Sequence, residues 1–217
     1  MREAILFDLD GTLWDATGSA SALWNRILEK HAFTGFHMSH TFAAGLMGKT
    51  MDEVGAVLFP ALSVEERRAI TDEFGVEEVR YLAENGAVLY EGVERTITSL
   101  AEEYDLYIVS NSQDGYVPAF LQAHALQSFF RDYEMSGRTG LDKGRNICLL
   151  MERNGISRAV FAGDAASDEE AARFAGIPFI WAAYGFGTAA APDASIQTIC
   201  DLPACVREVF RPSRKEP

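Results

Sequence analysis

Cysteine and histidine are scarce in this chain of 217 residues, and neither is arranged in a recognisable site. The three cysteines form an odd set without the paired spacing of a zinc motif, so we expect reduced thiols and no disulfide framework. The four histidines are scattered, and no neighbouring residues complete a ligand set around them. We therefore assign no chemistry to either residue type.

Long apolar runs are also missing. No stretch approaches the roughly 18 consecutive apolar residues of a membrane span, and the first residues lack the basic start and apolar segment of a signal peptide. Hydrophobic residues nevertheless make up 48% of the chain, enough for one α/β domain and a smaller module. We expect a cytoplasmic protein without a membrane partner.

Positive charge is the third shortage. The chain has 19 basic against 32 acidic residues, and its formal net charge is −13. This balance repels nucleic acid and anionic membranes, so we expect neither as a partner. An anionic ligand would need a metal ion and a few local donors to hold it. The lysines are therefore informative, and there are only four, namely Lys30, Lys49, Lys143 and Lys215.

The pattern of elements changes along the chain, which shows no internal repeat. Residues from about 19 to 84 are typical of helices without a strand, and Ser63 begins a capping box at one of them. From about residue 92 helices and apolar strands alternate. Strands are predicted at 106–110, 159–162 and 178–182, and helices at 93–102, 116–125, 145–154 and 169–175.

This alternation predicts a doubly wound α/β core with a parallel sheet covered on both faces. The helical block interrupts that core after its first strand, so we interpret it as an inserted cap. We place the core at residues 1–15 and 90–217 and the cap at residues 16–89. Ligands of open parallel sheets bind at the carboxyl ends of the strands, and the cap would close over that edge.

Two carboxylates follow the first predicted strand, the apolar run at residues 4–6. Asp8 and Asp10 alternate with apolar residues, so they are expected on one face, and Gly11 marks the turn. Such a pair repels unless a cation lies between the groups or one of them is protonated. Carboxylate oxygens suit Mg²⁺, and a carboxylate can also attack phosphorus to form an aspartyl-phosphate.

Residues 7–13, FDLDGTL, resemble the first motif of the haloacid dehalogenase-like hydrolases, most of which are phosphatases. The resemblance implies that Asp8 is the nucleophile and Asp10 the general acid and base. It also implies a helical cap inserted where the element pattern places one. Within the family the chain is most similar to phosphoglycolate phosphatases and β-phosphoglucomutases.

Later strand ends resemble the remaining motifs of the family. Ser110 ends a predicted strand and resembles the phosphate-binding hydroxyl of the second motif, with Asn111 beside it. Lys143 is the one lysine between that strand and the later acidic cluster, and there it would neutralise the nucleophile and the phosphoryl group. The resemblance therefore implies that Ser110, Asn111 and Lys143 bind phosphate.

The fourth motif supplies an acidic pair. In the run VFAGDAASD, Asp164 and Asp168 follow a strand and begin a helix, so both can face the strand-end crevice. The resemblance implies a Mg²⁺ site made by Asp8, the backbone carbonyl of Asp10, and Asp164, with Asp168 as a ligand or a supporting residue. In the cap, Lys49 lies where relatives keep a substrate-facing loop, and there it could contact the substrate.

These motifs together predict a magnesium-dependent phosphatase of small phosphorylated metabolites that works through an aspartyl-phosphate. Two alternatives share the fold. A dehalogenase needs neither Asp10 nor a metal, and a phosphomutase usually has a histidine where this chain has Ala20. A catalytically silent relative is a third alternative, although such proteins usually lack one of these residues. The sequence leaves the substrate and the oligomeric state open.

Overall fold

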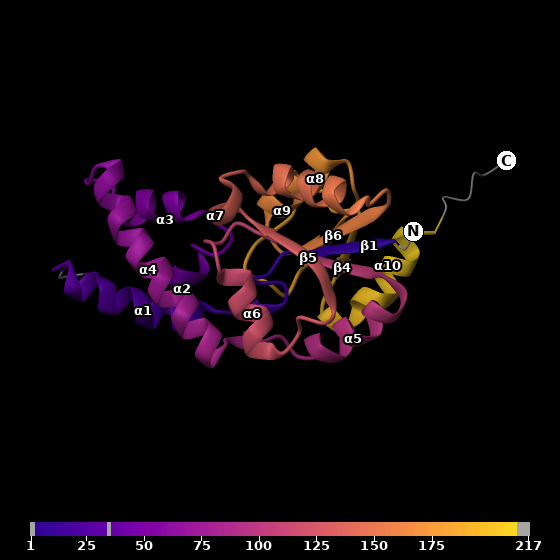
Figure 1. Ribbon diagram of the computed structural model, residues 1–217, viewed down its shortest axis with the longest axis horizontal. Coiled ribbons are helices and arrows are strands. Elements are labelled where there is room, and N and C mark those ends of the chain that lie inside the picture. The colour runs from indigo at the N-terminus through magenta and orange to yellow at the C-terminus, as the bar shows by residue number, and fades with distance from the viewer. Residues whose placement is uncertain (1–2, 34–35, 212–217) are drawn as a thin grey trace.

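The computed structural model describes residues 3–33 and 36–211 (Figure 1). The outermost residues of the predicted core, with Lys215 among them, lie outside these ranges. Within them, no helix has the combination of length and hydrophobicity that crossing a bilayer requires.

A six-stranded, fully parallel sheet forms the centre of the fold, in the order β5-β4-β1-β6-β7-β8. Its first strand lies between two strands that come much later in the chain, so its carboxyl end is flanked by theirs. All four β1 residues are buried, as a strand covered on both faces requires. The strands are β1 (Ala4–Phe7), β4 (Asp105–Ser110), β5 (Phe130–Met135), β6 (Ala159–Gly163), β7 (Phe179–Ala182) and β8 (Ala194–Ile196).

Helices cover both faces of the sheet. Successive side chains of β1 point to opposite faces and so belong to two different cores. Ile5 and Phe7 belong to a core shared with α5, α6 and α10, whereas Ala4 and Leu6 belong to a second core shared with α8 and α9. Figure 1 shows these two groups of helices on opposite sides of the sheet. The helices are α5 (Val93–Glu103), α6 (Tyr116–His124), α7 (Ser136–Thr139), α8 (Lys143–Asn154), α9 (Ala166–Ala175), the 3₁₀ helix η1 (Ile199–Asp201) and α10 (Leu202–Val209).

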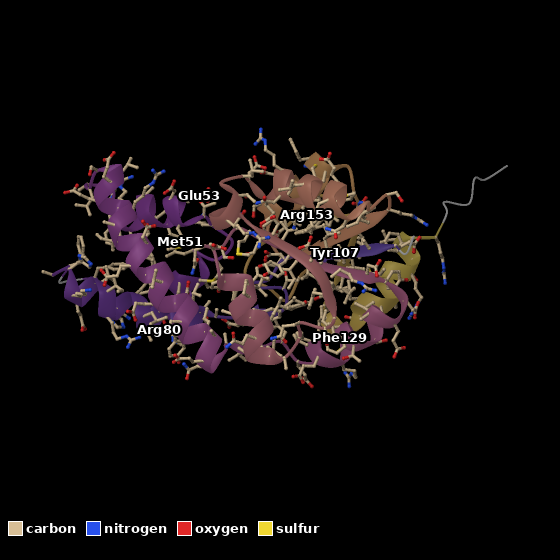
Figure 2. The ribbon with its side chains drawn as sticks, in the orientation of Figure 1. Met51, Glu53, Arg80, Tyr107, Phe129 and Arg153 are labelled. Carbon is tan, nitrogen blue, oxygen red and sulfur yellow. The ribbon has the colours of Figure 1, made fainter. Side chains whose placement is uncertain are left out.

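Four helices at one end of the molecule have a hydrophobic core of their own. Trp24 stacks on Phe74 within it, with ring centroids 3.9 Å apart. Ser63 and Glu66 form the predicted capping box at the start of the longest of the four, from which Arg80 points to solvent (Figure 2). The helices are α1 (Thr17–Lys30), α2 (His40–Ala44), α3 (Met51–Leu58) and α4 (Val64–Asn85).

A short antiparallel pair, β2 (Trp14–Asp15) and β3 (Val88–Leu89), joins the two ends of this helical segment. The pair lies at the predicted boundaries of the cap, and the separate core of α1–α4 supports the division, which remains a proposal. The predicted α/β fold with a parallel sheet is confirmed. The sequence patterns did not predict β5, β8 or α10.

Candidate active site

Asp8 lies at the carboxyl end of the central strand. Its backbone N–H donates to the carbonyl of Ala162 on the neighbouring strand (2.8 Å), which continues the ladder one residue past β1. The residue is only 2% exposed. A carboxylate so buried is held by its neighbours rather than by water, and those neighbours determine its chemistry.

Lys143 connects two of the buried acids. It is the first residue of α8, and its Nζ donates to Asp8 Oδ1 (2.7 Å) and Asp168 Oδ1 (2.5 Å). Burial acts to lower the pKa of Lys143, but the ion pairs with Asp168 and Asp8 outweigh it and raise the pKa overall. The ammonium therefore stays charged and fixes both carboxylates.

Asp164 and Asp168 are held by backbone donors as well. Asp168 Oδ2 accepts from the N–H groups of Asp164 and Ala165, each at 3.0 Å. Asp164 Oδ2 accepts from Phe186 N (2.7 Å) and Gly187 N (3.0 Å) in the loop after β7. This glycine-containing loop therefore orients a carboxylate of the site.

The acidic cluster fits a hard divalent cation. Carboxylate oxygens of Asp8, Asp164 and Asp168 lie within 4.8 Å of one another, and all three side chains are buried. Asp8 Oδ2 is buried without a hydrogen-bond partner in the described part of the chain. Burial, followed by the charges of Asp168 and Asp164, raises the pKa of Asp8 against the lowering effect of Lys143. One ammonium does not balance three carboxylates, and an oxygen-bound cation would supply the missing charge.

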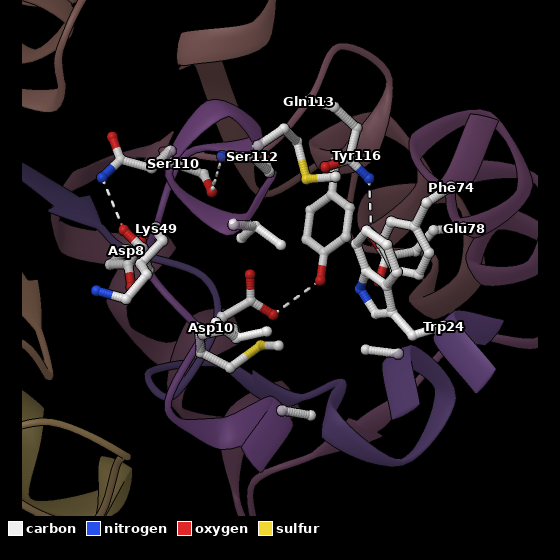
Figure 3. Close-up of a pocket in the computed structure, with 18 residues that line it drawn as sticks. Asp8, Asp10, Trp24, Lys49, Phe74, Glu78, Ser110, Ser112, Gln113 and Tyr116 are labelled. Carbon is white, nitrogen blue, oxygen red and sulfur yellow. Dashed lines mark hydrogen bonds between the residues drawn. The ribbon is translucent and has the colours of Figure 1, made fainter. Parts of the chain in front are cut away.

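Asp10 has a different environment. Its Oδ1 accepts from Trp14 Nε1 (2.9 Å) and Tyr116 Oη (2.8 Å), so the second oxygen is free to face the pocket (Figure 3). Burial raises the pKa of Asp10 to about 6, and the two donors moderate the increase. A carboxyl group with such a pKa can both give and take a proton near neutral pH. Trp14 follows the first motif directly, but nothing in the sequence indicated Tyr116.

Ser110 is the last residue of β4, the strand next to β1, and Asn111 follows it. Ser110 is 2% exposed, and its Oγ accepts from Ser112 N (3.2 Å), which leaves its own hydrogen available to a ligand. Asn111 donates to the carbonyl of Gly48 (2.9 Å) and accepts from Ser136 Oγ (3.1 Å). Its side chain thus connects the core to the helical segment, and its predicted phosphate contact stays a prediction.

One pocket brings most of the predicted residues together. Asp8, Asp10, Ser110, Asn111 and Lys49 all line it (Figure 3). Lys143, Asp164 and Asp168 do not line it, but they lie next to Asp8. Lys143 bonds to Asp8, and carboxylate oxygens of the other two lie close to it. The remaining wall comes from α1–α4 and the start of α6, which supply mainly apolar side chains and the carboxyl group of Glu78. No motif or spacing pattern indicated Glu78.

Comparison with known proteins decides the family. The sequence model described as haloacid dehalogenase-like hydrolase matches residues 5–182, which include every predicted site residue. The chain belongs to the haloacid dehalogenase-like hydrolases. This confirms the family predicted from the first motif.

Relatives within this family are phosphoglycolate phosphatases. The chain is 27% identical to the one from Pseudomonas syringae pv. tomato, and the match covers all of this chain and 86% of that protein. It is 26% identical to the plasmid-encoded one from Cupriavidus necator, over 99% of this chain and 95% of that protein. The crystal structure of a predicted phosphatase from Clostridium acetobutylicum shares the fold, with a TM-score of 0.82 at 21% identity, covering 96% of this chain and 99% of that one.

Proposed function

We propose that the protein is a magnesium-dependent phosphatase that hydrolyses small phosphate monoesters through an aspartyl-phosphate on Asp8. The observation that carries the proposal is the state of Asp8, which has one oxygen on Lys143 and the other buried without a hydrogen-bond partner among the described residues. That second oxygen is available for attack on phosphorus. The phosphoglycolate phosphatases among the relatives support the class of substrate.

The acidic cluster provides the ligands for Mg²⁺ in this proposal. Asp8 and Asp164 would bind it directly, together with the backbone carbonyl of Asp10. Both oxygens of Asp168 are already engaged, by Lys143 and by two backbone N–H groups, so its part is to hold Lys143 and the start of α9 in place. When bound, the cation neutralises charge on the phosphoryl oxygens.

Asp8 is the nucleophile in this proposal, and Asp10 is the general acid in the first step and the general base in the second. Asp8 Oδ2 attacks phosphorus, the bond from phosphorus to the alcohol oxygen breaks, and protonated Asp10 gives its proton to that oxygen. Asp10 then takes a proton from water, the water oxygen attacks phosphorus, and the bond to Asp8 breaks to release phosphate. Trp14 and Tyr116 hold the other oxygen of Asp10, so the proton is carried by the oxygen that faces the pocket.

Lys143 and Ser110 stabilise the transferring group from two sides. Lys143 is fixed between two carboxylates and supplies a compact positive charge, and the Ser110 hydroxyl can donate to a phosphoryl oxygen. Ala20 supports hydrolysis over a mutase reaction. It lines the pocket on α1, and its methyl group cannot take the part of the histidine usual in the mutases.

Removal of the nucleophile tests the proposal. With Mg²⁺, the protein is expected to hydrolyse p-nitrophenyl phosphate and acetyl phosphate, and a chelator should abolish the activity. Asp8→Asn should lower kcat at least about 1,000-fold, because an amide does not form the aspartyl-phosphate. Asp72→Asn, a change of an exposed acid on α4, is the matched control. Activity that survives Asp8→Asn would contradict the mechanism, and no activity on any ester would favour a silent relative.

A further inference from the structure

The wall of the pocket opposite Asp8 and Ser110 is apolar and faces the place where a leaving group would lie. It includes Trp24, Leu46, Met51 and Phe74, and Trp24 and Phe74 are stacked so that neither can turn away readily. Charged groups lose hydration in such surroundings and gain nothing unless an opposite charge meets them. The wall therefore favours an uncharged organic group.

Two charged side chains of the helical segment line the pocket, and they lie on opposite sides of it. Figure 3 shows Lys49 on the side of Asp8 and Glu78 on the far side, near Trp24 and Phe74. The bond from Asn111 to the carbonyl of Gly48 fixes the loop next to Lys49 beside the phosphate end. Among the residues that the structure describes, no other lysine, arginine or histidine lines this pocket, so none of them places a cation on its far side.

Glu78 is the carboxyl group on the far side of the pocket. It is 5% exposed, its Oε2 accepts from Gln113 Nε2 (2.7 Å), and no ion pair within the described residues balances it. Burial is the main reason that the pKa of Glu78 is raised to about 8, and nearby Asp10 adds to the effect. The same low-dielectric surroundings would penalise a carboxylate on the substrate.

We infer that the leaving group of the substrate is a small uncharged alcohol with a second hydroxyl that bonds to Glu78, and that Glu78 disfavours esters whose far end is a carboxylate. A hydroxyl both donates and accepts, so it can pair with Glu78 in either protonation state. A carboxylate only accepts, so it finds no donor in ionised Glu78, and with protonated Glu78 it would have to share one proton between two carboxyl groups without a cation. The inference rests on the proposed phosphatase function and narrows it to phosphates of short polyols and sugars.

Two pairs of esters test this preference because each pair differs only at the far end. Glycerol 3-phosphate is compared with 3-phosphoglycerate, and 2-hydroxyethyl phosphate with phosphoglycolate. In each pair we expect kcat/KM to be on the order of tenfold higher for the hydroxyl compound, since an unpaired charge at a desolvated contact is strongly selected against. Equal or higher kcat/KM for the carboxylate compounds would overturn the inference.

Glu78→Gln isolates the residue responsible, because it keeps the shape and replaces the ionisable carboxyl group with an amide that can donate to a carboxylate. The preference should fall to a few-fold at most, whereas Glu84→Gln, at an exposed position of the same helix, should leave it unchanged. An unaltered preference in Glu78→Gln would refute the assignment to Glu78. The proposed function fails differently, because then the wild-type protein hydrolyses neither these esters nor p-nitrophenyl phosphate.

Discussion

At the scale of single residues, the site contains more buried negative charge than buried positive charge. Asp8, Asp164 and Asp168 converge at the end of the sheet, and Lys143 contacts two of them. Burying charges without balancing them costs several kcal/mol per ion. Lys143 therefore has a structural part to play before any substrate binds.

Removal of Lys143 should weaken the fold. We expect Lys143→Met to lower the free energy of unfolding by about 3–5 kcal/mol in a chelator, because it leaves two buried carboxylates unpaired. Added Mg²⁺ should restore part of the loss by replacing the missing charge. Lys30→Met is the control, since its ion pair with Glu73 is largely exposed and should contribute about 1 kcal/mol or less.

Denaturant unfolding with and without Mg²⁺ measures both effects. A Lys143→Met protein as stable as the wild type, or one to which Mg²⁺ gives no added stability, would contradict this account of the cluster.

Glu78 makes stability depend on pH. Its pKa is about 8 in the folded protein against an ordinary value of 4.5, so the folded state holds a proton that the unfolded state releases between these values. The free energy of unfolding therefore falls as pH rises from about 4.5 to 8. Glu78→Gln removes this loss, and its melting temperature should exceed that of the wild type by a few degrees at pH 8.

At pH 5 the same substitution should change the melting temperature much less, because Glu78 is protonated there in the folded wild type. Thermal unfolding followed by circular dichroism at the two pH values gives the comparison, with Glu84→Gln as the exposed control. Melting curves of wild type and Glu78→Gln that shift in parallel with pH would argue against a buried, protonated Glu78.

At the scale of elements, the side chain of Asn111 joins the loop between α2 and α3 to the core. Asn111 bonds to the carbonyl of Gly48 in that loop and to Ser136 in the core. The loop also carries Lys49 next to the pocket. The closed arrangement of pocket and loop thus depends on an amide that follows β4.

Asn111→Ala should loosen this closure. We expect faster hydrogen exchange around residues 46–50, a KM raised several-fold, and a loss of about 1 kcal/mol in the free energy of unfolding, as for a typical hydrogen bond. Ser63→Ala, which removes a helix cap far from the pocket, should cost a similar free energy without changing KM. An unchanged KM in Asn111→Ala would show that the contact is not needed for substrate binding.

Strands were predictable from sequence where nearly all of their residues are buried and apolar. Strands β1, β4, β6 and β7 are apolar runs, and their pattern predicted them. Strand β5 escaped prediction because its sequence, FRDYEM, mixes charged and aromatic residues at the edge of the sheet, where Glu134 pairs with Arg138 and Arg153. Tertiary contacts decide such a strand, and local pattern does not reveal them.

The site divides in the same way. Asp8, Asp10, Lys143 and Asp164 could be singled out because the motifs of the family place those residue types in that order along the chain, and their catalytic roles stay predictions. Tyr116 and Glu78 could not, because an ordinary tyrosine and one acid in an acidic helix become special only when α4 and α6 meet at the pocket. Backbone donors such as Phe186 N leave no trace in the residue type.

The whole molecule carries a net charge of −13, and its substrate is expected to be an anion. Long-range repulsion should slow their encounter at low ionic strength. Raising NaCl from about 10 to 150 mM at constant Mg²⁺ shortens the screening length from roughly 30 to 8 Å. We expect kcat/KM to rise a few-fold, mainly through KM.

Sucrose at matched osmolality is the control for solvent effects and should leave kcat/KM unchanged. A decrease of kcat/KM with salt would mean that the local positive charge of Lys49 and the bound metal governs the approach of the substrate. Steady-state kinetics on glycerol 3-phosphate over this NaCl series distinguishes long-range repulsion from local attraction.

The loop after β7 has a consequence for how this site can evolve. Asp164 is oriented by two backbone N–H groups. Among point mutations, only a change to proline removes a backbone N–H. What mutation can change is space, since a side chain at Gly185 would run into Asp164 and the backbone of Gly11. Selection on this loop therefore keeps position 185 free of a Cβ atom. Gly185 should tolerate replacement as poorly as Asp164, the carboxylate beside it.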